Sequence, residues 1–219
     1  MFPPVFPIYI SALVPLYEYA PLIWMTGVVC LWLTRYTHQL GKRWGQTFYL
    51  LSSFVRPLGI FLIAVGWLAL YAPDLGEKTP FLYRTDWIPT DSWTDRLFLL
   101  AMLVSFAFGV WAVVTLGFRR SFLYRHLGDS LITHGPYAIV RHPQFLAAIA
   151  VTFFGTRLFD ADVFREYGYP QYYHSLTINW VLFTAALWAL SILEDRELAA
   201  HFGKVYEVYA RKVPRLFPN

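Results

Sequence analysis

The chain contains a single cysteine and few charged residues. Cys30 has no second cysteine with which to pair, so an internal disulfide and a thiolate metal cluster are both excluded. Only 15% of the 219 residues are charged, whereas soluble domains carry roughly 25%. So little charge is not enough to cover a water-facing surface. The composition therefore indicates an integral membrane protein.

The sequence also lacks the common signatures of nucleotide-binding and hydrolytic enzymes. It contains no G-x-G-x-x-G, G-x-x-x-x-G-K-[ST], H-E-x-x-H or G-x-S-x-G, so Rossmann, P-loop, zincin and serine-hydrolase sites have no support. Its six histidines are scattered. His134 and His142 are the one pair near a common turn, and no metal site is predicted from them. No basic region or small-residue cleavage site marks the N-terminus, so a cleaved signal peptide is not expected.

Apolar residues dominate what is present. They make up 57% of the chain, and the mean hydropathy is +0.43. Five apolar segments approach the ~20 residues that cross a bilayer as a helix. These segments are residues 16–33, 54–72, 97–117, 144–159 and 176–193. The sequence predicts an all-α integral membrane bundle of about five transmembrane helices, with residues 1–219 as one domain.

The net charge of +4 lies in particular loops. The loops after the first and third apolar segments and the C-terminal tail are basic, whereas residues 73–96 and 160–175 form acidic loops. Basic residues between apolar runs are typical of cytoplasmic loops, so no nucleic-acid binding is predicted. The positive-inside rule places the N-terminus outside and the C-terminus in the cytoplasm.

The tail after Glu194 has the pattern of an amphipathic helix. Its apolar positions are Leu198, Phe202, Val205, Tyr206 and Tyr209, opposite Lys204, Glu207 and Arg211. Pro214 would end such a helix. We expect this helix on the cytoplasmic side, either on the membrane surface or folded back over a site.

One polar cluster precedes the fourth apolar segment. Pro143 fits the first turn of a helix, and it forces His142 out of helical geometry into a cap-like position. Arg141 and His142 would then lie at the positive end of that helix, where free backbone N–H groups favour an anion. Arg141 can bind a carboxylate or phosphate with two parallel hydrogen bonds. The alternative role for Arg141 is an anchor beside lipid headgroups.

A second polar cluster follows the fifth apolar segment. Glu194 and Asp195 are expected at the C-terminal end of a helix, where acids oppose the helix dipole. Contact with a cation, an amino group or ribose hydroxyls would explain them. The alternative is an ion pair with Arg196 or with a lysine of the tail.

The two clusters together resemble the isoprenylcysteine carboxyl methyltransferase family and the related phospholipid methyltransferases. The matching residues are Leu116-Gly117, Gly135, Tyr137, Arg141-His142-Pro143, Glu194-Asp195, Leu198, Phe202-Gly203, Tyr206, Tyr209 and residues 214–218. The likeness covers about residues 116–219, whereas residues 1–117 match only as generic membrane helices. Four positions depart from the family pattern: Phe145 replaces a tyrosine, Asp195 a longer acid, Asp129 a histidine and Leu190 an arginine.

The resemblance implies an S-adenosylmethionine-dependent methyltransferase without a Rossmann domain. Residues 118–219 would bind the cofactor at the cytoplasmic face, and a hydrophobic, lipid-like acceptor would enter from the bilayer. The implied cofactor-binding residues are His134, Gly135, Tyr137, Arg141, His142, Pro143, Glu194, Asp195, Phe202 and Tyr206. The implied catalytic residues are Arg141, His142 and Glu194. Within this set, Arg141 would bind the methionine carboxylate, and Glu194 or Asp195 the ribose or amino group.

Other interpretations stay open from the sequence. The acceptor is a carboxylate, an amine or a thiol, and the last two need a base, for which His142 and His134 are the candidates. A membrane reductase would use Arg119, Arg120, Arg125 and Arg141 for the phosphates of NADPH. A non-enzymatic subunit or transporter would place ionisable residues near mid-bilayer. The predicted segments hold only Arg56 and Arg157, both near segment ends. The oligomeric state is not predicted.

Overall fold

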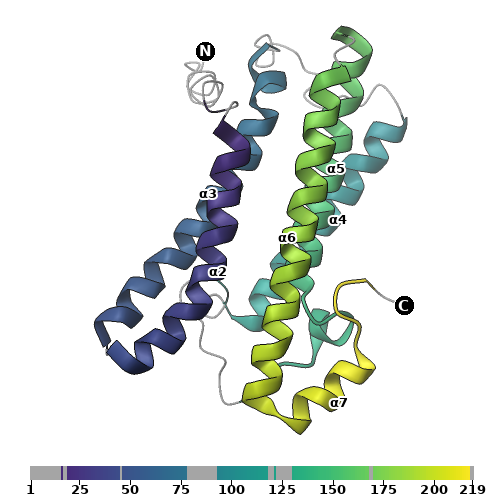
Figure 1. Cartoon of the computed structure of the whole chain (residues 1–219). Helices are drawn as coiled ribbons and strands as arrows, with labels where there is room; N and C mark the ends of the chain where they lie inside the picture. The colour runs from purple at the N-terminus through teal and green to yellow at the C-terminus, as the bar shows by residue number, and fades with distance from the viewer. Residues whose placement is uncertain are drawn as a thin grey trace, which may run out of the picture.

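The computed structural model describes the backbone of residues 16, 19–44, 46–77, 93–117, 121, 130–167 and 170–217. These residues form the helices α2 (Ala20–Trp44), α3 (Gln46–Glu77), α4 (Trp93–Leu116), α5 (Pro143–Tyr167), α6 (Pro170–Phe202) and α7 (Lys204–Lys212), with a 3-10 turn, η4 (Gly135–Ala138). The described part contains no strand, which confirms the all-α prediction. In Figure 1, α2 and α3 form a pair on one side of α6, and α7 leads away from the lower end of α6.

Three helical segments are long and apolar enough to cross a membrane. They are Phe54–Tyr71 in α3, Trp93–Leu116 in α4 and Leu176–Phe202 in α6, whereas the apolar Ala20–Thr34 of α2 is shorter. The search covers the described residues only, and five spans are not confirmed. The α4 surface carries exposed apolar side chains, among them Leu103, Phe106 and Val114. Such a surface fits lipid tails and not water.

Helices extend beyond the predicted apolar segments. The predicted acidic loop at 160–175 is wrong, because α5 continues to Tyr167 and α6 already begins at Pro170. Likewise, α3 continues to Glu77. An apolar run marks only the part of a helix that lies in hydrocarbon, and a helix can continue through polar residues beyond it. Residues 78–92, which belong to the other predicted acidic loop, lie outside the described residues.

Two glycines allow α2 and α3 to touch backbone to backbone. A Cβ atom placed on Gly27 would lie 2.5 Å from the carbonyl oxygen of Gly59, and one on Gly59 would lie 2.8 Å from that of Gly27. Neither distance leaves room for a side chain. In membranes, where lipid removes the hydrophobic drive for helix pairing, close backbone approach at small residues is a main source of helix association.

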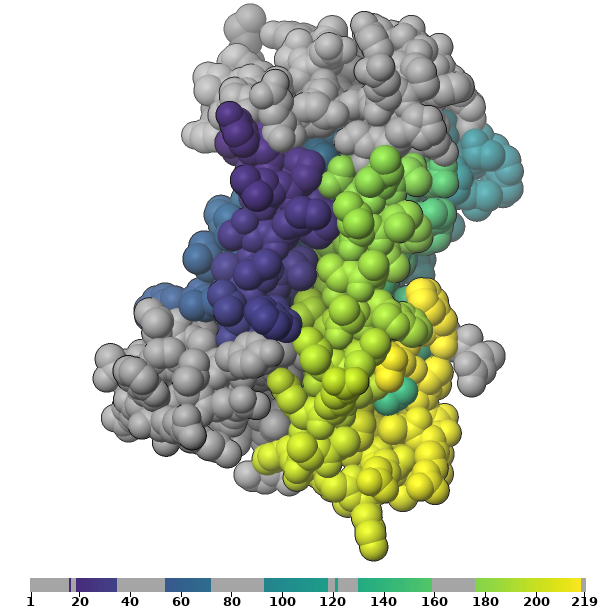
Figure 2. Space-filling view, in the orientation of Figure 1, coloured from purple at the N-terminus to yellow at the C-terminus, as the bar shows by residue number. Residues whose placement is uncertain are grey.

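Aromatic side chains join this pair to the rest of the bundle. The Trp24 indole of α2 donates a 3.0 Å hydrogen bond to Asn179 Oδ1 of α6, and its ring packs edge-on against Phe183 at 5.6 Å. Tyr71 of α3 donates to the carbonyl of Thr152 in α5 at 3.2 Å. Figure 2 shows α2, in purple, lying directly against α6. Helices α2, α3, α5 and α6 therefore pack around one hydrophobic core.

The tail differs from its prediction in two ways. Instead of ending after Leu193, α6 continues to Phe202, so Glu194 and Asp195 lie well inside it. The proposed conflict between these acids and the helix end is therefore wrong. Gly203 has a φ of 56°, a conformation that favours glycine, and it ends α6. A separate helix, α7, follows.

The break at Gly203 also changes which side of the tail is apolar. Tyr206 and Tyr209 are buried, as predicted, but Val205 is 64% exposed. The predicted apolar stripe assumed one continuous helix from Leu198 onward. Because Gly203 resets the helical phase, residues before and after it do not share one face.

We predict that Gly27→Ala destabilises the protein, although a glycine-to-alanine change in an uncrowded helix stabilises it. The added methyl group would overlap the Gly59 carbonyl and push α2 from α3, at a cost of about 1–3 kcal/mol. Thermal unfolding in detergent measures the change. Val29→Ala, at a half-exposed position of α2, is the control; equal stability of both variants would contradict the close packing.

Candidate functional site

A short segment after α7, residues 213–217 (the strap), runs back along the loop before α5. The backbone N–H groups of Arg141 and His142 donate to the carbonyls of Pro214 and Arg215 at 2.9 and 3.1 Å. The Tyr209 hydroxyl of α7 donates to the carbonyl of Tyr137 in η4 at 2.6 Å. In Figure 1 the strap is the yellow segment beyond α7. The strap and α7 thus fix the position of both basic residues.

His142 has the cap-like position that Pro143 predicts. It is the last residue before α5, and its carbonyl accepts the hydrogen bond of the Leu146 N–H at 3.1 Å. Its ring lies nearly parallel to that of Phe145, with centroids 5.7 Å apart. Phe145 therefore packs against the imidazole from one side.

Asp195 is the centre of the polar cluster. Its Oδ2 accepts 2.7 Å hydrogen bonds from Arg141 Nη1 and Arg215 Nε. Its Oδ1 lies 2.7 Å from His142 Nε2 and accepts a short hydrogen bond from the Tyr206 hydroxyl. The carboxylate is only 8% exposed. Its ion-pair partners are thus Arg141, His142 and Arg215, and the predicted pairing with Arg196 or a tail lysine is not found among these contacts.

Two acids favour the charged form of His142. Burial by itself lowers the pKa of His142, but the hydrogen bonds to Asp195 and Glu194 and their negative charges outweigh it, so the pKa of His142 is raised. Glu194 Oε2 lies 3.3 Å from His142 Nδ1. Burial, followed by the hydrogen bond to Asp195, also raises the pKa of Tyr206, which stays a protonated donor.

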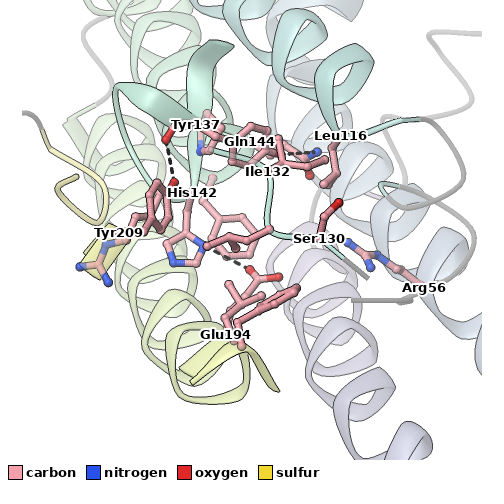
Figure 3. Close-up of a pocket in the computed structure, with 15 residues that line it drawn as sticks. Arg56, Leu116, Ser130, Ile132, Tyr137, His142, Gln144, Glu194 and Tyr209 are labelled. Atoms are coloured by element: carbon pink, nitrogen blue, oxygen red, sulfur yellow. Dashed lines mark hydrogen bonds and ion pairs between the residues drawn. The ribbon is translucent and has the colours of Figure 1, made fainter. Parts of the chain in front are cut away.

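A pocket opens beside this cluster, with about 840 Å³ of empty space including its open mouth. Its lining combines charged, polar and apolar side chains from α3, the end of α4, the segments around η4, α5, α6 and α7. They are Arg56, Leu116, Ser130, Leu131, Ile132, Tyr137, Arg141, His142, Pro143, Gln144, Phe145, Glu194, Leu198, Phe202 and Tyr209. Figure 3 shows His142 and Glu194 next to each other in the wall.

Most of the predicted cofactor residues meet at this pocket. Those that line it are Tyr137, Arg141, His142, Pro143, Glu194 and Phe202, including all three predicted catalytic residues. Asp195 and Tyr206 lie behind the wall and hold Arg141 and His142. His134 is exposed and Gly135 packs near Thr115. Neither lines the pocket; Gly135, at a φ of 61°, shapes the turn.

Sequence reasoning missed several lining residues. Gln144 Nε2 donates to the Ser121 hydroxyl at 3.0 Å and lies 3.4 Å from the Tyr137 hydroxyl, so it links two segments of the wall. Arg56 comes from α3, far from both motifs. The only signal in the sequence that could have identified Arg56 as a lining residue is its positive charge within an apolar segment. Arg119, Arg120, Arg125 and Asp129 lie outside the described residues. Within the described ranges, no three His, Cys, Asp or Glu residues form a metal site.

Comparison with known proteins adds no relative. No family model matches the chain, and neither curated proteins nor solved structures give a significant match. The methyltransferase resemblance therefore stays a prediction that rests on the motif residues themselves.

We predict that Asp195→Asn destabilises the fold much more than Glu194→Gln. The first change leaves the buried His142 and the largely buried Arg141 without this counter-charge, and breaking a buried pair costs about 3–5 kcal/mol. Glu194 is 25% exposed at its side chain, and loss of its pair with His142 should cost about 1 kcal/mol. Thermal unfolding in detergent compares the two variants, and a smaller loss for Asp195→Asn would show that the cluster does not hold the fold.

The stability should also depend on pH through His142. Its pKa is above 6.5 in the folded protein, so folding takes up a proton. The stabilisation is complete below about pH 6.5 and is lost as the pH rises through the raised pKa. We expect the unfolding midpoint to fall as the pH rises above about 6.5, and His142→Gln to flatten this slope. A slope in His142→Gln equal to that of the wild type would contradict the raised pKa of His142.

Proposed function

We propose that the protein is an integral membrane methyltransferase that uses S-adenosylmethionine and acts on a hydrophobic, lipid-like acceptor. The convergence of the two motifs carries this proposal. His142 and Asp195 are 53 positions apart and in direct contact, and Arg141, His142 and Glu194 line one pocket with apolar side chains. A charged wall beside an apolar one suits a charged cofactor and an oily acceptor together.

The residues of the wall fit the cofactor. Arg141 uses one terminal nitrogen for Asp195, and its Nε has no hydrogen-bond partner among the described residues. Because Arg141 also lines the pocket, its guanidinium is placed to bind the methionine carboxylate. Glu194 is partly exposed in the pocket and suits the amino group or the ribose hydroxyls. Phe202 offers an aromatic surface for the adenine.

The protein has little covalent chemistry to supply. Bound S-adenosylmethionine brings a methyl group already activated by its sulfonium. The chain's contribution is to hold the acceptor in line and to exclude water. Leu116, Leu131 and Ile132 form an apolar part of the wall that serves both purposes.

The charge on His142 bears on the choice of acceptor. Both ring nitrogens of His142 lie near carboxylates, and its raised pKa favours the protonated ring. It is therefore a poor general base. This supports an acceptor atom that is already deprotonated, such as a carboxylate. The pattern of loop charges supports a cytoplasmic site with the N-terminus outside.

We expect calorimetric titration of the detergent-purified protein to show micromolar binding of S-adenosylmethionine and S-adenosylhomocysteine. Arg141→Ala should weaken both by about tenfold or more, because a charge-assisted hydrogen bond contributes about 1.5–3 kcal/mol. Arg211→Ala, which removes an exposed arginine of α7, should leave binding unchanged. Preferential binding of NADPH would instead support a reductase, and no binding to folded protein would contradict an enzyme at this pocket.

A further inference from the structure

Gln144 and Tyr137 form an uncharged polar part of the pocket wall. Gln144 is the second residue of α5, and Tyr137 belongs to η4. Both side chains line the pocket. Figure 3 draws Gln144 at the upper side of the view and Glu194 at the lower side. The pocket therefore offers a ligand an uncharged polar pair as well as the charged residues of the Asp195 cluster.

The protein fixes the orientation of the Gln144 amide. Its Nε2 donates one hydrogen bond to the Ser121 hydroxyl at 3.0 Å and a second, longer one to the Tyr137 hydroxyl at 3.4 Å. An amide nitrogen of glutamine carries two hydrogens, so both are used. The Oε1 atom accepts no hydrogen bond from the described residues, and it is not one of their fully buried unpaired atoms. Gln144 therefore keeps an accessible acceptor for a ligand.

The Tyr137 hydroxyl keeps its proton for a ligand. Its oxygen accepts the hydrogen bond from Gln144, and no described residue accepts its proton. Burial, followed by the negative charge of Glu194, raises the pKa of Tyr137 above its usual value. Since the usual value for tyrosine is already about 10, the hydroxyl is a donor at neutral pH. A hydrogen-bond donor and an acceptor thus lie next to each other on the wall.

A neighbouring donor and acceptor suit the edge of a heterocycle that offers the same two groups in return. In adenine, the exocyclic amino group donates and the ring nitrogens beside it accept. An ammonium group has donors only and a carboxylate has acceptors only, so neither matches the pair. The lining also includes Leu116 and Ile132, which offer apolar contact to a ring. The other lining tyrosine, Tyr209, already donates its hydroxyl proton to the Tyr137 carbonyl.

We propose that Gln144 and Tyr137 determine specificity for the adenine base of the cofactor. Gln144 Oε1 accepts a hydrogen bond from the amino group, and the Tyr137 hydroxyl donates to a ring nitrogen beside it. The inference rests on the proposed methyltransferase function. It leaves Arg141 and Glu194 for the methionine and ribose parts of the cofactor. Ser121, which is 2% exposed, acts through the Gln144 amide and is a positioning residue.

Titration of the detergent-purified full chain with S-adenosylhomocysteine and S-inosylhomocysteine tests this assignment. The inosyl compound carries a carbonyl in place of the amino group, so its oxygen would face Gln144 Oε1 without a hydrogen. A site built to hydrogen-bond one group rejects an analogue that lacks it. We expect the wild type to bind the adenosyl compound about tenfold more tightly than the inosyl one.

Variants assign this preference to the two side chains. Gln144→Leu and Gln144→Met, which both remove the acceptor, should abolish the preference. Tyr137→Phe should weaken binding of S-adenosylhomocysteine by about three- to tenfold. Tyr19→Phe removes the hydroxyl of an exposed tyrosine that does not line the pocket, so it should change neither quantity. Thermal unfolding shows whether each variant is folded.

The outcomes separate this inference from the proposed function. If the wild type binds both compounds equally, or if the preference survives in a folded Gln144 variant, the inference is overturned and the methyltransferase proposal stands. Tighter binding of the inosyl compound also overturns it, because Gln144 would then present its nitrogen. If the protein instead binds NADPH and rejects the hypoxanthine analogue of NADPH through Gln144, the adenine site stands and the methyltransferase proposal fails. If folded protein binds neither cofactor, both fail.

Discussion

The polar end of the molecule depends on the buried charge of Asp195. A carboxylate that is 8% exposed is stable only when its oxygens are paired. Its partners are Arg141 and His142 before α5, Tyr206 on α7 and Arg215 on the strap. Each of these segments must take up its observed place for the charge to be satisfied. The shape of the pocket wall is therefore largely a consequence of neutralising one acid.

Helix α6 carries both exposed apolar residues and the two acids of the polar cluster. Near its middle, α6 presents exposed apolar residues such as Val181 and Leu182, and further along it carries Glu194 and Asp195. The acids therefore lie on the same helix as an apolar segment that is long enough to cross a membrane.

The sequence predicted the features that local signals control. The proline at 143 placed the start of α5, and the two motifs indicated which residues would meet. The sequence did not predict where α6 ends. The apolar run stops before Glu194 and Asp195, so the two acids were taken to mark the end of the helix, whereas α6 continues through them to Phe202. The exposure of Val205 depended on a phase break at Gly203. The contribution of Arg56 depended on how α3 packs, and no local pattern encodes such packing.

The hydrogen bonds between the strap and the loop before α5 set an order of assembly during synthesis. The loop with Arg141 and His142 leaves the ribosome before residues 213–217 are made, and its two N–H groups then lack the carbonyls of Pro214 and Arg215. Asp195 likewise lacks Arg215 until that stage. A chain stalled after α6 would already hold its membrane helices, yet its charged wall would be incomplete.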